Sequence, residues 1–69
     1  MDASMSTEDV AHRLAAIRAA SDDGEVAHGL ADGLYRDVLT AIAAGAPDAP
    51  ILAAAALRTE TIDFERWYA

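Results

Sequence analysis

Cysteine and lysine are both missing from the 69-residue sequence, which carries five arginines against twelve acidic residues and a formal net charge of −7. Without cysteine the chain can form no disulfide, no thiolate metal site and no cysteine nucleophile. The acidic balance argues against direct binding to nucleic acid or to an anionic membrane, because both contacts are driven by cationic side chains. The composition therefore favours a protein as the partner.

Long apolar runs and strong catalytic motifs are missing as well. No stretch approaches the ~18 apolar residues of a membrane span, and the start, Met1-Asp2-Ala3-Ser4-Met5, lacks the basic and apolar regions of a signal peptide. The sequence contains no glycine-rich phosphate loop, serine elbow, P-loop lysine or histidine pair at i and i+4. We therefore expect a cytoplasmic protein that is not an enzyme and holds no cofactor.

Alanine is abundant, and the larger apolar residues recur with a helical period. Alanine is the best helix former, and this period is typical of amphipathic helices. The sequence predicts an all-α fold, a small three-helix bundle with helices at about 7–20, 24–44 and 49–58. The length fits a single helical domain over 1–69, in which we expect residues 1–5 to be frayed.

Capping and turn residues mark the ends of these helices. Ser6 or Thr7 can accept hydrogen bonds from the free amides at the start of the first helix. The run Ser21-Asp22-Asp23-Gly24 interrupts the helical pattern and supplies an aspartate that can cap the second helix. Gly45 suits the left-handed residue that follows a helix, and Asp48 is a good cap for the third helix.

Apolar stripes indicate which side of each helix faces the core. In the first helix the stripe is Val10, Leu14 and Ile17, and in the third it is Ile51, Leu52 and Leu57. In the second helix, apolar residues recur at four-residue spacing: Val26, Leu30, Leu34, Val38 and Ile42. Such a stripe slips by about 40° per step and winds around its helix. Two charged pairs have the spacing of helical ion pairs: Asp9 with Arg13, and Asp32 with Arg36.

Gly29 and Gly33 lie inside the second predicted helix, where each costs about 1 kcal/mol relative to alanine. Close approach of another helix would offset that cost. Together with Ala27 and Ala31, the two glycines form a shallow face on which a helix could pack. We expect the first helix of the same chain to pack there, with a second copy in a homodimer as the alternative.

A carboxylate stands three residues before a histidine twice, as Asp9 with His12 and as Glu25 with His28. Glu-x-x-His is the spacing with which di-iron bundles present ligands to a metal, and Asp32 extends the second pair. Glu25, His28 and Asp32 are therefore the candidate metal ligands. The further glutamates of such bundles are not evident, and an antiparallel hairpin separates the two histidines, so we expect no bound metal.

Aromatic residues gather at the C-terminus, where Phe64, Trp67 and Tyr68 follow Ile62. Alanine-rich helices leave shallow grooves, so this aromatic tail should pack back on the helices and fill them. The alternative is a docking motif, because Trp, Tyr and Arg are enriched among interface hot spots. In that case Phe64, Arg66, Trp67 and Tyr68 would contact a partner.

A resemblance covers roughly the last forty residues, from His28 onward. It is carried by Leu34-Tyr35-Arg36-Asp37-Val38-Leu39, Ile42-Ala43-Ala44-Gly45, Ala56-Leu57 and the ending Ile62-Asp63-Phe64-Glu65-Arg66-Trp67-Tyr68-Ala69. They resemble small helical proteins of actinobacteria and their phages, and the Ile-Asp-Phe-x-Arg-Trp ending is the most specific part. The resemblance implies an accessory gene product. That group brings no assigned activity to transfer.

The leading hypothesis is a non-enzymatic interaction or regulatory protein that presents its acidic surface or its aromatic tail to a protein partner. One alternative is an acidic mimic of nucleic acid that blocks a DNA-binding protein, although no helix carries a long acidic row. The other alternative is a helical metal-binding protein that uses Glu25, His28 and Asp32.

Overall fold

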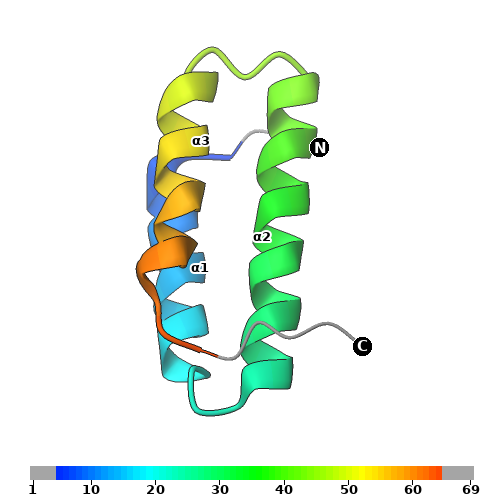
Figure 1. Cartoon of the computed structure of the whole chain (residues 1–69). Coiled ribbons are helices and arrows are strands. Elements are labelled where there is room, and N and C mark those ends of the chain that lie inside the picture. Colours follow the sequence, from blue (N-terminus) through cyan, green and yellow to red (C-terminus); the bar gives the residue numbers. More distant parts are fainter. Residues whose placement is uncertain (1–4, 65–69) are drawn as a thin grey trace.

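Three helices pack against one another in a computed structural model that describes residues 5–64. The elements of this part of the chain are α1 (Thr7–Ala19), α2 (Gly24–Ala43), α3 (Ala49–Ala56) and the short 3-10 helix η1 (Leu57–Thr61). α1 and α3 run in the same direction, and α2 lies antiparallel beside both (Figure 1). The predicted all-α three-helix bundle is confirmed. None of the helices in the described residues is long and apolar enough to cross a membrane.

The start of α1 is held by a reciprocal pair of hydrogen bonds between Ser6 and Asp9. The Asp9 amide donates to the Ser6 hydroxyl at 3.1 Å, and the Ser6 amide donates to the Asp9 carboxylate at 2.9 Å. This capping box confirms Ser6 as the cap. The predicted ion pair between Asp9 and Arg13 is wrong, because the carboxylate caps its own helix and Arg13 bonds elsewhere.

The ends of the other helices follow the predicted turn residues in most respects. Asp23 caps α2 by accepting a hydrogen bond from the Val26 amide at 3.3 Å. Gly45 follows α2 with a φ of 96°, the left-handed conformation that favours glycine. Asp48 precedes α3 as predicted, but its side chain makes no capping hydrogen bond.

The core lies along the line where the three helices meet. α1 buries its predicted stripe, whereas α2 buries another row: Ala27, Ala31, Leu34, Val38 and Ala41. This row alternates steps of four and three residues and therefore stays on one side of the helix. The strict four-residue stripe drifts off that side, so Val26 and Leu30 are 49% and 37% exposed. The winding predicted from the four-residue spacing is confirmed, and only Leu34 and Val38 of this stripe are fully buried.

The chain after α3 closes one end of the bundle. The Thr59 side chain of η1 is buried, and its hydroxyl hydrogen-bonds the Tyr35 hydroxyl of α2. Ile62 and Phe64 are buried in the same cluster as the helical core residues. Residues 65–69 lie outside the described residues, so the packing of the whole aromatic tail stays a prediction. Met5 packs partly buried against the core, and residues 1–4 also lie outside the described part.

Candidate functional site

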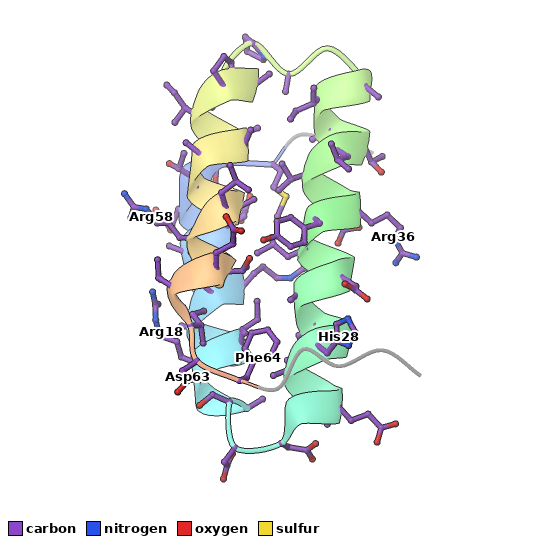
Figure 2. All side chains as sticks on the ribbon, viewed as in Figure 1. Arg18, His28, Arg36, Arg58, Asp63 and Phe64 are labelled. Carbon is purple, nitrogen blue, oxygen red and sulfur yellow. The ribbon has the colours of Figure 1, made fainter. Side chains whose placement is uncertain are left out.

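His28 and Asp32 come together on α2, but the third candidate metal ligand does not join them. The His28 Nε2 lies 3.3 Å from an Asp32 carboxylate oxygen, across one helical turn. The predicted ion pair between Asp32 and Arg36 is wrong, because Asp32 faces His28. Arg36 projects outward from α2 (Figure 2). Within residues 5–64, no group of three or more His, Asp or Glu side chains is placed to hold a metal ion. Glu25, His28 and Asp32 thus provide no three-ligand site.

A small cleft lies between α2 and the chain that follows α3. Its volume is about 170 Å³, and its lining residues are His28, Ala31, Asp32, Tyr35, Thr59, Glu60 and Phe64. Figure 2 shows His28 on α2 and Phe64 on the facing segment at the same height of the bundle. Small-molecule sites usually enclose about 300 to 1,000 Å³. The cleft is smaller, and its residues hold η1 and Phe64 against α2.

The two glycines of α2 do not receive α1 as predicted. A methyl group added at Gly29 would meet no neighbouring atom of residues 5–64 within 4 Å, and one added at Gly33 would lie 3.5 Å from an Arg13 guanidinium nitrogen. Arg13 passes over Gly33 and donates to an Asp37 carboxylate oxygen at 2.9 Å. The predicted packing of the first helix on this face is therefore wrong, since a side chain approaches one glycine and nothing in the described residues approaches the other. A homodimer through the face stays a prediction.

A larger, apolar groove runs between α1 and α3. Its volume is about 400 Å³, and its lining residues are Thr7, Val10, Ala11, Leu14, Pro50, Ile51, Ala54, Ala55 and Arg58. The buried Val10 and Leu14 form its floor. Ala11 and Ala54 are exposed, and because their side chains are small the space between the helices stays open. Ile51 stands at the groove with 61% of its surface exposed.

This groove was not predicted from the sequence. Ile51 and Leu57 belong to the predicted apolar stripe of the third helix, but both are exposed and only Leu52 of that stripe is buried. The sequence signal was the presence of a small residue on each helix, Ala11 on α1 and Ala54 on α3. These two alanines indicate a groove only once α1 and α3 are known to lie side by side.

Two arginines lie on the side of the molecule that carries the groove. Arg58 lines it, and Arg18 lies in the last turn of α1, which runs parallel to α3. Both side chains project from the side of the molecule opposite α2 (Figure 2). Neither forms an ion pair with another residue of the 5–64 region, whereas Arg13 is paired with Asp37. Exposed acids stand close to both arginines in the sequence, Asp22 after Arg18 and Glu60 and Asp63 after Arg58. The groove therefore has an apolar floor and no net positive charge near these arginines.

Comparisons with protein-family models, with curated proteins and with solved structures find no significant match to this chain. The resemblance of its C-terminal segments to small actinobacterial and phage proteins stays a prediction. What the protein does is therefore inferred from its own surface.

Proposed function

We propose that this protein is a non-enzymatic interaction module that binds a helix of a protein partner in the groove between α1 and α3. The observation that supports this most directly is Ile51, which is 61% exposed beside an apolar groove of about 400 Å³. Large apolar side chains beside an apolar concavity are typical of surfaces that bury the apolar face of an amphipathic helix.

The small residues of the groove suit a helical occupant. Packed helices lie about 8 to 10 Å apart, and the shorter distances require small side chains at the contact. Ala11 and Ala54 supply such side chains on the two rims. A helix bound there would complete a four-helix bundle and cover the exposed part of Ile51, which favours association in a domain whose own core is small.

The distribution of acidic groups supports an interaction module more than a nucleic-acid mimic. Asp9 and Asp23 cap helices, and Asp37 is paired with Arg13. These carboxylates serve the fold of the chain, and arginines stand among them. A mimic needs a continuous acidic face in place of a row of phosphates.

A matched pair of substitutions on α1 tests the proposal. Ala11→Trp would fill the groove, while Ala16→Trp places the same side chain about 140° further around the helix, and both alanines are exposed. In affinity capture from a lysate of the source organism, we expect a partner that the wild type and Ala16→Trp retain and that Ala11→Trp loses. The same set of captured proteins for all three would contradict the assignment of the groove.

A further inference from the structure

We infer that the turn between α1 and α2 is a site of covalent modification, at which Asp23 and Gly24 convert spontaneously to an isoaspartyl linkage. The sequence contains two Asp-Gly pairs, Asp23-Gly24 and Asp32-Gly33. Aspartate converts most readily before glycine, because glycine has no Cβ to hinder the approach of its amide nitrogen to the neighbouring carboxyl carbon. The inference is independent of the groove between α1 and α3.

The conversion proceeds in two steps, and water is its only co-reactant. In the first step the Gly24 amide nitrogen attacks the side-chain carboxyl carbon of Asp23. A C–N bond closes a succinimide ring, the C–OH bond breaks, and the hydroxyl leaves with the amide proton as water. In the second step water adds to one of the two ring carbonyls. Opening at the side-chain carbonyl regenerates aspartate, and opening at the main-chain carbonyl yields isoaspartate, whose main chain is one methylene longer.

The two Asp-Gly pairs are alike in their access to solvent. Asp23 and Asp32 are both exposed, and Gly24 and Gly33 are both half-buried. Neither the sequence of the pair nor its exposure therefore distinguishes them. The difference between the two pairs lies in the backbone, because each amide nitrogen has a different place in α2.

Asp32-Gly33 lies in the interior of α2, where each backbone amide donates to the carbonyl four residues before it. Ring closure requires the peptide plane between the two residues to rotate, and here the rotation would break helical hydrogen bonds on both sides of it. The Asp32 carboxylate also lies 3.3 Å from the His28 Nε2. Because the interior of a helix opens less readily than its ends, the fold protects this pair.

Asp23-Gly24 lies at the start of α2, with Asp23 as the cap and Gly24 as the first residue. The first amides of a helix have no carbonyl acceptor within it, so the Gly24 nitrogen is not held by the helix. The Asp23 carboxylate accepts from the Val26 amide at 3.3 Å, which is long for such a bond. Rotation of this peptide costs that bond and the one from the Ala27 amide to the Asp23 carbonyl, while the rest of α2 stays formed.

Isoaspartate at residue 23 would alter the turn that reverses the chain between α1 and α2 (Figure 1). The added methylene lengthens the main chain between the two helices. The former side-chain carboxyl of Asp23 becomes part of the main chain, so it can no longer cap the Val26 amide. Since loss of a cap destabilises a helix, we expect the modified chain to melt at a lower temperature.

Peptide mapping of the full chain tests the inference, because one peptide carries both Asp-Gly pairs. Trypsin cuts after Arg18 and Arg36, so both pairs lie in the peptide 19–36. After long incubation of the folded chain at neutral pH, electron-transfer fragmentation should locate isoaspartate at residue 23 in at least about tenfold excess over residue 32. In the chain unfolded by urea, the two sites should convert at similar rates.

Asp23→Ser separates the modification from its effect on stability. Serine caps a helix but has no carboxyl group to close the ring. After the same incubation, the melting temperature of the wild type should fall, and that of Asp23→Ser should stay as in its fresh sample. The matched control Gly33→Ala removes the other pair, and its added methyl group is in ordinary contact with Arg13. It should lose stability on incubation as the wild type does.

Two results would overturn the inference. Equal amounts of isoaspartate at residues 23 and 32 in the folded chain would show that the start of α2 opens no more readily than its interior. Isoaspartate at residue 23 in the unfolded chain alone would show that the turn protects Asp23 fully. Neither result bears on the groove, which Ala11→Trp tests separately.

Discussion

Gly29 and Gly33 both interrupt α2 with residues that weaken a helix, yet their surroundings differ. Above Gly33, the Arg13 side chain crosses from α1 to reach Asp37, and a glycine leaves room for the guanidinium group. Both charged side chains are more than a third exposed, so the pair contributes little to stability. Above Gly29, nothing in the described residues lies within 4 Å of an added methyl group.

The glycines make a testable contrast in stability. Gly29→Ala should raise the free energy of unfolding by about 1 kcal/mol, because alanine removes the entropic cost of a helical glycine and its methyl group meets no neighbour among the described residues. Gly45→Ala should lower it by about 1 kcal/mol, because the φ of 96° is unfavourable for any residue with a Cβ. Urea unfolding followed by circular dichroism measures both changes. A loss of stability in Gly29→Ala would show that another helix packs on this glycine.

At the scale of one element, the start of α1 depends on a carboxylate that also titrates. The pKa of Asp9 is lowered, first by the hydrogen bond from the Ser6 backbone amide and then by the hydrogen bond with the Ser6 side chain. The folded state therefore favours the ionised carboxylate. This contribution to stability is complete above the pKa of an unfolded aspartate, about 3.9, and it is lost as the pH falls through the lowered pKa of the folded chain.

We expect Asp9→Asn to show this dependence as a difference from the wild type. At pH 7 the variant should melt at a lower temperature, because an amide side chain caps the Ser6 amide less strongly than a carboxylate. At a pH below the lowered pKa of Asp9, the two melting temperatures should converge. Thermal melts by circular dichroism over this pH range provide the measurement. A difference that stays constant with pH would mean that the Asp9 charge does not support α1.

At the scale of the whole molecule, the alanine residues of the helices and the large residues after α3 depend on each other. Ala27 and Ala31 of α2 and Ala56 of α3 are buried. Their side chains are small and leave space that larger side chains at these positions would fill. Ile62 and Phe64 join these residues in one core cluster. The 3-10 helix η1 brings them there, with Thr59 bonded to Tyr35 at the base of the turn.

Removal of the Phe64 ring should therefore weaken the entire fold. Phe64→Ala should lower the free energy of unfolding by about 3 kcal/mol, which is a large share of the stability of so small a domain. The control Leu39→Ala changes a leucine that is 64% exposed and should cost less than about 0.5 kcal/mol. Equal effects of the two substitutions in urea unfolding would show that the Phe64 ring does not belong to the core.

The successful predictions concern interactions between residues close in the sequence. Ser6, Asp23 and Gly45 act at the helix ends as expected, because caps and left-handed turns depend on a few neighbouring residues. The ion pair expected between Asp9 and Arg13 failed because a capping bond within the same turn competed for the carboxylate. Arg13 instead found Asp37, which is 24 residues away in the sequence.

The sequence by itself determined the all-α class, the three helices with their caps and the buried stripe of α1, since backbone propensity and periodicity are local properties. Only the tertiary structure decided which row of α2 is buried, which partner Arg13 takes and where an open groove remains. The physical reason is that small residues such as Ala11, Ala31 and Ala54 fit equally well in a core, in a groove or on a surface. Their role depends on which helix lies opposite, and this is decided when the helices pack.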